Sequence, residues 1–250
     1  MIARSSKIIA LASTALLFVA LFATAHVRAQ SSDAAFGAPV IAEDRTIYTF
    51  DPIDPMQVFP QGVKHLIGFV SVSGLPDNSE VTSEWFQDGT SQGKLDPIKT
   101  DSKTTQISSR WESDAGLDAG SWEVRFTYNG NVVAKAIAKV QAGAFVYPMR
   151  FGDDCTFYTA ELFDEQKDFG AAQLNVAARI RYANLPQDSK LEIQWYLAGT
   201  DILESSDTFT GTGVTCFSIS KDGGLKSGSY QIKVVLDSKV LRTQDFTVGS

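Results

Sequence analysis

The segment Leu191-Glu-Ile-Gln-Trp-Tyr-Leu197 alternates apolar and polar side chains along its whole length. Successive side chains of a β-strand point to opposite faces, so this alternation predicts a strand that is buried on one face. The same period of two recurs in residues 122–128, 176–182 and 230–236. Turn-forming residues such as Leu185-Pro-Gln-Asp188 separate these segments. The sequence therefore predicts an all-β chain of short antiparallel strands.

The chain also repeats itself at a distance of about 110 residues. When residues 44–90 are placed over residues 154–200, twelve of the 47 positions are identical, among them Thr46/Thr156, Tyr48/Tyr158, Thr49/Thr159 and Trp85/Trp195. Downstream, the similarity continues at a shift of 108. A period of this length is the size of a domain that folds alone. We therefore expect two tandem antiparallel β-sandwich domains of about seven strands each, at residues 35–141 and 144–250.

Residues 1–29 have the layout of a secretory signal peptide. Arg4 and Lys7 precede an apolar run from Ile8 to Ala25, and small residues follow at Val27 and Ala29. We expect cleavage near Ala29 and an extracytoplasmic destination, which is the periplasm, the cell surface or the medium. An uncleaved N-terminal anchor is the alternative, because an apolar run of this length is barely enough to cross a bilayer. After cleavage we expect no stable membrane insertion.

The charge balance disfavours nucleic acid as a partner. Removal of residues 1–29 takes away Arg4, Lys7 and Arg28, so 19 basic residues remain against 29 acidic ones, a balance of −10. A polyphosphate partner requires clustered Lys and Arg, whereas here the two signs are mixed along every segment. The partners that remain are proteins and envelope polymers.

The phrase Leu225-x-x-Gly228-x-Tyr230 resembles the tyrosine corner of immunoglobulin-like and fibronectin type III-like sandwiches, in which a Tyr hydroxyl bonds back to the preceding turn. In the first repeat Trp122 takes the place of Tyr230, so there the resemblance implies the packing role without the hydroxyl bond. With a Trp on the third strand as well, each repeat resembles bacterial extracytoplasmic immunoglobulin-like repeats. The resemblance implies a fold and does not specify an activity.

The only two cysteines, Cys155 and Cys216, both lie in the second repeat. The first repeat has Arg45 in place of one and Ser108 or Ser109 in place of the other, so both cysteines are absent together, as a bonded pair would be. In an oxidising compartment we predict a disulfide between them. The alternatives are two free buried thiols and intermolecular pairing.

The sequence offers little for catalysis. Without the leader His65 is the only histidine, so the chain offers a single candidate base for Ser–His catalysis. One His and two Cys are too few for a zinc site, and no P-loop, dinucleotide-binding or EF-hand motif is present. Adjacent carboxylates on a strand point to opposite faces, which disfavours glycoside hydrolysis. We expect no catalytic residues, no metal and no cofactor, so the protein would not be an enzyme.

Two sets of residues remain as binding candidates. Asp153 and Asp154 stand at the junction of the repeats, where carboxylates can hold calcium; the competing interpretation is a solvated turn. Trp111, Phe86 and Tyr196 are candidates for ligand-facing rings, because flat apolar rings stack on sugars or bind protein partners; the competing interpretation is ordinary packing. We therefore expect a non-catalytic interaction or structural protein. The alternative is a carbohydrate-binding or other ligand-binding accessory module.

Overall fold

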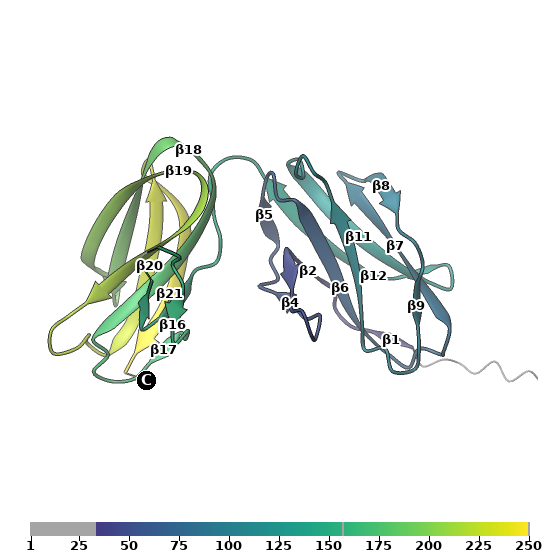
Figure 1. Cartoon of the computed structure of the whole chain (residues 1–250), viewed down its shortest axis with the longest axis horizontal. Helices are drawn as coiled ribbons and strands as arrows, with labels where there is room; N and C mark the ends of the chain where they lie inside the picture. The colour runs from purple at the N-terminus through teal and green to yellow at the C-terminus, as the bar shows by residue number, and fades with distance from the viewer. Residues whose placement is uncertain (1–33, 157, 250) are drawn as a thin grey trace, which may run out of the picture. The chain divides into compact units, whose positions relative to one another are not determined.

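The computed structural model describes residues 34–156 and 158–249 (Figure 1). These residues form strands, turns and loops without any helix, which confirms the all-β prediction. They fall in one compact unit that begins at Ser32. The predicted signal peptide, residues 1–29, lies outside the described residues. Within the described ranges, no helix is long and apolar enough to span a membrane.

Residues 35–141, here called the first half, form two sheets and a small hairpin. In the first sheet, β6 (His65–Ser73) pairs antiparallel with β1 (Ala35–Phe36), β2 (Val40–Ala42) and β10 (Gln106–Glu112). The second sheet has the order β5 (Val58–Pro60), β12 (Asn131–Gln141), β11 (Gly120–Tyr128), β7 (Ser79–Gln87) and β8 (Thr90–Lys94), with β9 (Ile98–Thr100) also paired to β7. The hairpin consists of β3 (Asp44–Arg45) and β4 (Pro52–Ile53).

Residues 145–248, here called the second half, form one seven-stranded sheet and a matching hairpin. The sheet has the order β13 (Phe145–Val146), β18 (Asn175–Leu197), β20 (Gly228–Leu236), β21 (Lys239–Val248) and β17 (Asp168–Phe169), while β14 (Arg150–Gly152) and β19 (Thr200–Ser220) also pair with β18. The hairpin consists of β15 (Asp154–Cys155) and β16 (Leu162–Phe163).

Each half has its own large hydrophobic cluster. The cluster of the first half runs from Ile41 to Val140 and includes the fully buried Trp85. The cluster of the second half runs from Val146 to Val248 and includes the fully buried Trp195. The alternate apolar residues of the strands supply both clusters, as a period of two requires. The domain boundaries 35–141 and 144–250 remain a prediction.

The turn expected at residues 185–188 differs from the structure. β18 continues through this stretch for 23 residues, and β19 runs antiparallel beside it for 21 (Figure 1). Register shifts occur around Leu185, and both Asn184 and Asp188 adopt positive φ. Such irregularities bend a strand without ending its pairing, so Pro and Asp here mark bulges rather than a turn. In the first half, the equivalent stretch separates β6 from β7.

The tyrosine corner is present, and its counterpart in the first half is more complete than the sequence suggested. The hydroxyl of Tyr230 donates a hydrogen bond to the carbonyl of Lys226 at 2.8 Å. The indole N–H of Trp122 donates to the carbonyl of Asp118 at 3.0 Å, also four residues upstream. The expectation that Trp122 keeps only the packing role is therefore wrong, because an indole N–H reaches the same carbonyl position as a phenol.

Candidate binding site

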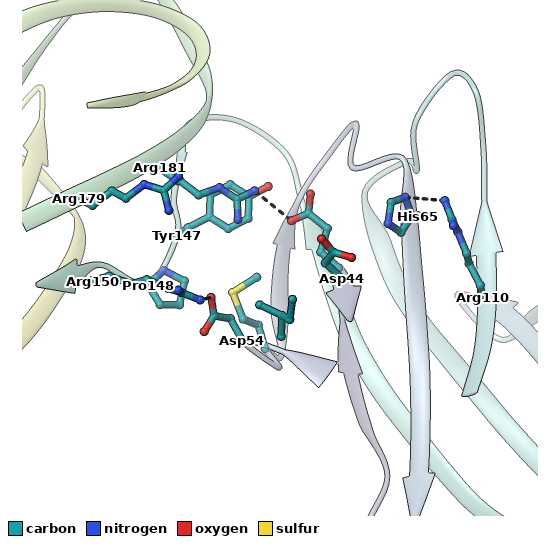
Figure 2. A pocket seen from close by; sticks show the side chains of 12 residues that line it. Asp44, Asp54, His65, Arg110, Tyr147, Pro148, Arg150, Arg179 and Arg181 are labelled. Atoms are coloured by element: carbon teal, nitrogen blue, oxygen red, sulfur yellow. Dashed lines mark hydrogen bonds and ion pairs between the residues drawn. The ribbon is translucent and has the colours of Figure 1, made fainter. Parts of the chain in front are cut away.

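A cavity of about 440 Å³ is lined mainly by charged side chains (Figure 2). Its lining comprises four arginines, three carboxylates, one histidine and four apolar or aromatic residues: Arg110, Arg150, Arg179, Arg181, Glu43, Asp44, Asp54, His65, Ile53, Met56, Tyr147 and Pro148. A cavity of this volume has the size of a small-molecule site.

Three of the arginines share one face of the second half. Arg150 on β14 is the direct antiparallel partner of Arg179 on β18, and Arg181 follows two residues later on the same strand. Directly paired residues, and residues two apart on a strand, point to the same side of a sheet. The strand register therefore brings together three guanidinium groups from two separate stretches of sequence.

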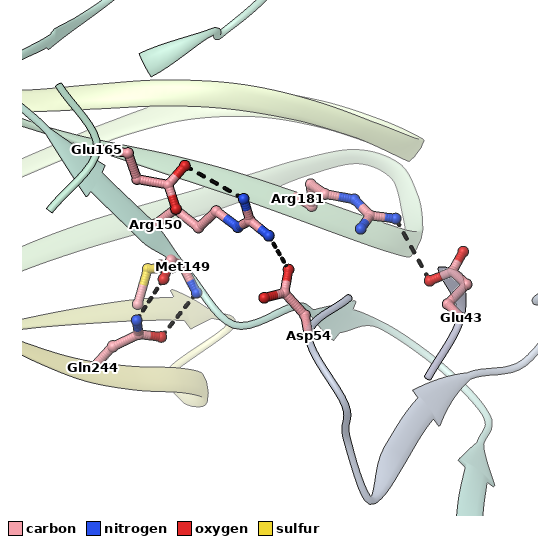
Figure 3. Close-up of polar contacts among 7 residues, drawn as sticks. All are labelled: Glu43, Asp54, Met149, Arg150, Glu165, Arg181 and Gln244. Atoms are coloured by element: carbon pink, nitrogen blue, oxygen red, sulfur yellow. Dashed lines mark hydrogen bonds and ion pairs between the residues drawn. The ribbon is translucent and has the colours of Figure 1, made fainter. Parts of the chain in front are cut away.

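Carboxylates of the chain balance two of these arginines (Figure 3). Arg150 forms an ion pair with Asp54 and a second one with Glu165 at 3.3 Å. The hydrogen bond that Arg150 donates to the carboxylate of Asp54 is the main reason why the pKa of Arg150 is raised above its ordinary value. Arg181 lies 3.5 Å from Glu43, close enough for an ion pair, and its guanidinium also lies over the ring of Tyr147.

Tyr147 forms a buried wall of the cavity. Burial, followed by the negative charge of Glu43, raises the pKa of its phenol, and the nearby positive charge of Arg181 opposes this shift in part. The phenol therefore stays protonated at neutral pH, and can donate a hydrogen bond but not act as a base.

His65 lines the cavity, and its imidazole contacts an arginine rather than a hydroxyl. Its Nδ1 lies 3.3 Å from a guanidinium nitrogen of Arg110, which also pairs with Glu112 at 3.0 Å. Ser–His catalysis needs a hydroxyl within reach of the imidazole, and no hydrogen bond between His65 and a hydroxyl occurs in the described residues. The arrangement is suited to binding charged groups.

The calcium candidates lie outside this cavity. One carboxylate oxygen of Asp153 accepts hydrogen bonds from the side-chain amides of Gln166 and Gln173, at 3.0 and 2.9 Å. Asp154 accepts the backbone N–H of Cys155 at 2.8 Å. Within residues 34–156 and 158–249, no group of three or more His, Cys, Asp or Glu side chains is placed to hold a metal ion. The structure therefore shows both carboxylates engaged with amides of the chain.

The predicted disulfide between Cys155 and Cys216 is confirmed, and it ties the β15–β16 hairpin to β19. In the first half Arg45 and Ser108 hold the equivalent positions, and the guanidinium of Arg45 donates to the hydroxyl of Ser108 at 3.3 Å. Of the two serines considered from the sequence, Ser108 is thus the one in contact. A covalent bond in one half and a hydrogen bond in the other join the same two elements.

Both hairpins expose a tyrosine that sequence reasoning did not single out. Tyr48 is 92% exposed and Tyr158 is 95% exposed, each in the loop that connects the two short strands. In the first hairpin Ile47, beside the tyrosine, is 81% exposed. The identity of both tyrosines at a shift of 110 was the available signal, because neither has a buried strand pattern to explain it.

The loops of the two hairpins share the hydrogen bonds made by their threonine side chains. Thr46 and Thr49 share a side-chain hydrogen bond at 2.6 Å, and the corresponding pair Thr156 and Thr159 is bonded too. The hydroxyl of the first threonine in each loop also accepts the backbone N–H five residues later. The tyrosine of each loop is therefore held on a turn with defined hydrogen bonds.

The three aromatic residues predicted to face a ligand lie outside the cavity. Phe86 is buried under the guanidinium of Arg125, which lies 3.9 Å from the ring centre. Tyr196 is half-buried, and the ammonium of Lys233 lies 4.1 Å from its ring centre. Trp111 is half-buried and packs against the first hydrophobic cluster. Side chains of the protein cover one face of two of these three rings.

Comparisons with known proteins place the chain among loosely similar β-structures. No protein-family model and no curated protein matches it. Similar solved structures include titin domains Z1Z2 in complex with telethonin, at 14% identity over 86% of this chain and 94% of that chain, with a TM-score of 0.26. They also include fibronectin(III)-like modules of Clostridium thermocellum CbhA, at 14% identity over 86% and 93%, with a TM-score of 0.26.

A β-glycosidase from Bacteroides vulgatus is similar at 13% identity over 76% of this chain, with a TM-score of 0.32. The match covers only 23% of the glycosidase chain. Similarities of this strength identify neither a family nor an activity.

Proposed function

We propose that this protein is an exported, non-catalytic interaction protein that presents its two tyrosine-tipped hairpins to a protein partner. The observation that carries the proposal is the duplicated hairpin, with Tyr48 and Tyr158 each more than nine-tenths exposed. Tyrosine supplies a large, rigid contact area with a polar end, and it is enriched among the residues that dominate protein interfaces.

The way the hairpins are attached supports a binding role. A loop that is ordered before binding loses less conformational entropy when it meets a partner. The disulfide of the second hairpin and the Arg45–Ser108 hydrogen bond of the first both restrict loop motion. The neighbouring Ile47 adds an exposed aliphatic side chain. An aliphatic side chain beside a tyrosine suits the apolar centre of a protein interface better than the flat face of a sugar ring.

The cavity supports binding rather than turnover. Two of its three carboxylates, Glu43 and Asp54, face guanidinium groups, and glycoside hydrolysis would need a free pair placed on both sides of a sugar bond. Arg125 and Lys233 cover the rings that would otherwise stack on a glycan. A protein partner is therefore favoured over the carbohydrate-binding alternative.

A photoreactive amino acid at position 48 or 158 of the exported chain tests the proposal in the producing cell. The matched controls carry the same group at Val132 or Leu174, which are exposed apolar residues outside the hairpins. We expect one discrete protein adduct from positions 48 and 158 and none from the controls. The purified partner should then bind a double variant, Tyr48→Ala with Tyr158→Ala, at least about tenfold more weakly than the unchanged chain.

Other outcomes of this experiment count against the proposal. An adduct that is a glycan polymer would support the carbohydrate-binding alternative, and equal labelling at all four positions would remove the hairpins from consideration. N-terminal sequencing of the exported chain should begin near Gln30, whereas retention of residues 1–29 would indicate an anchored protein.

A further inference from the structure

We propose that the cavity next to β14 and β18 binds a small organic carboxylate, with Arg179 as its main contact. This site is separate from the hairpin tips and does not depend on their role. The proposal combines an arginine without a counter-ion, a cavity that Arg179 lines, and apolar walls beside it (Figure 2).

Arg179 is the arginine of this cavity that the chain leaves unbalanced. Arg110, Arg150 and Arg181 each form an ion pair with a carboxylate. Arg179 has no ion pair within the described residues, and its buried Nε has no hydrogen-bond partner there. A buried N–H without an acceptor is unfavourable, and an oxyanion in the cavity would supply that acceptor.

The strand register makes this arrangement costly in the absence of an anion. Arg150 and Arg179 are direct cross-strand partners, and like charges at such positions repel each other. In the first half Val40 and Phe69 occupy the same register positions, where they contribute to a small apolar cluster. Apolar residues at these two positions therefore allow the same strand pairing, and the sheet does not need the arginine pair of the second half in order to form.

The chemistry of the cavity favours a monoanion with an apolar part. Of the four arginines of the lining, Arg179 alone has no carboxylate partner among the described residues, so the cavity offers one unpaired guanidinium. A guanidinium fork matches the two oxygens of a carboxylate, whereas a phosphate dianion would bring a second charge close to the three acidic side chains. Ile53, Met56 and Pro148 offer apolar contact beside these charges.

Calorimetric titration of the chain from Gln30 onward at low salt tests the proposal, with N-acetylphenylalanine as the carboxylate probe and its neutral amide as the matched ligand. We expect the acid to bind and the amide to give no heat. Arg179→Gln should weaken binding of the acid at least about tenfold. Lys190→Gln removes an equal charge from an exposed site on the same strand, and should leave the affinity unchanged.

Asp44→Asn should change the affinity in the opposite direction, so the test does not depend on a loss of binding alone. Asp44 lines the cavity, and its Oδ1 accepts the N–H of Arg45, which an asparagine oxygen can also accept. Removing this negative charge should strengthen binding of the acid about two- to fivefold. Circular dichroism confirms that each variant is folded.

Four results would overturn the proposal. They are equal binding of acid and amide, unchanged affinity in Arg179→Gln, absence of heat from the acid at millimolar concentration, and tighter binding of inorganic phosphate than of the acid.

Discussion

The indole N–H of Trp85 donates a hydrogen bond to the hydroxyl of Ser109 at 2.8 Å, deep in the first hydrophobic cluster. That hydroxyl in turn donates to the hydroxyl of Ser83 at 2.8 Å. The equivalent tryptophan of the second half, Trp195, is also fully buried, but its indole N–H has no partner within the described residues. The position that corresponds to Ser109 in the second half is Phe217, which has no hydroxyl to accept this hydrogen bond. Two tryptophans with the same place in the fold therefore differ in their polar contacts.

The two tryptophans should respond differently to replacement by phenylalanine. Trp85→Phe removes both ring volume and a buried hydrogen bond, whereas Trp195→Phe removes ring volume and an unsatisfied donor. We expect Trp85→Phe to lower the free energy of unfolding by about 1–2 kcal/mol more than Trp195→Phe does. Urea unfolding followed by far-UV circular dichroism measures the difference, and equal losses would show that the hydrogen bond contributes nothing.

Reduction of the disulfide should destabilise the second half selectively. The bond joins residues 61 positions apart, and on the chain-entropy model a loop of this length stabilises by about 4 kcal/mol. We expect reductant to lower the melting temperature of the unchanged chain and to leave a Cys155→Ser, Cys216→Ser double variant unaffected. Labelling of two free thiols in the unfolded, unreduced protein would contradict the bond.

Arg45→Ala is the corresponding change in the first half. It removes an exposed hydrogen bond to Ser108 and the contact of the guanidinium with the ring of Phe50, so we expect a loss of about 1 kcal/mol in the free energy of unfolding. A loss as large as that of the disulfide would show that the first hairpin depends on Arg45 for more than these two contacts.

The two corner residues give a test of the carbonyl contact that they share. Tyr230→Phe removes the hydroxyl bond to Lys226, and Trp122→Phe removes the indole bond to Asp118 together with ring volume. We expect Tyr230→Phe to cost about 0.5–1.5 kcal/mol, and Trp122→Phe to cost more. Thermal unfolding by calorimetry compares the two variants. An unchanged stability in Tyr230→Phe would show that the hydroxyl hydrogen bond does not stabilise the corner.

Stability should fall at alkaline pH, partly through Tyr147. Its pKa is raised in the folded protein, chiefly by burial, so the neutral phenol is favoured by folding and the phenolate is not. The resulting stabilisation is complete below the unfolded pKa of about 10, and is lost as pH rises above it. We expect the melting temperature of Tyr147→Phe to decline less steeply above about pH 10 than that of the unchanged chain. Tyr48→Phe, at an exposed hairpin tip, is the control and should match the unchanged chain.

The fold was largely predictable because its signals are local. The alternation in residues 191–197 correctly indicates a strand with one buried face, since Leu191, Ile193 and Trp195 all lie in the core. The strand through Leu185 was not predictable, because Pro and Asp favour both turns and bulges, and the pairing with β19 decides between them. The donor role of Trp122 was missed since it depends on the path of the preceding turn.

The cavity was harder to predict because the pairing of distant strands brings its charged residues together. Arg179 and Arg181 stand two residues apart in an alternating segment, which placed them on one face from the sequence alone. Arg150 lies 29 residues before Arg179, and only the pairing of β14 with β18 brings the two together. The exposed Tyr48 was hidden for a different reason: a sequence repeat shows that two residues correspond, but not that they point to solvent.

The unbroken path of β18 and β19 affects how the second half can open. In the first half, β6 and β7 belong to different sheets, so one sheet can fray while the other keeps its ladder of hydrogen bonds. In the second half one strand, β18, takes the place of both β6 and β7 and pairs with β19 on either side of the register shifts at Leu185, so both parts of the ladder lie in one sheet and opening of one part would disturb the other. Amide hydrogens along β18 should therefore exchange with solvent as a single cooperative block, while those of β6 and β7 exchange as two.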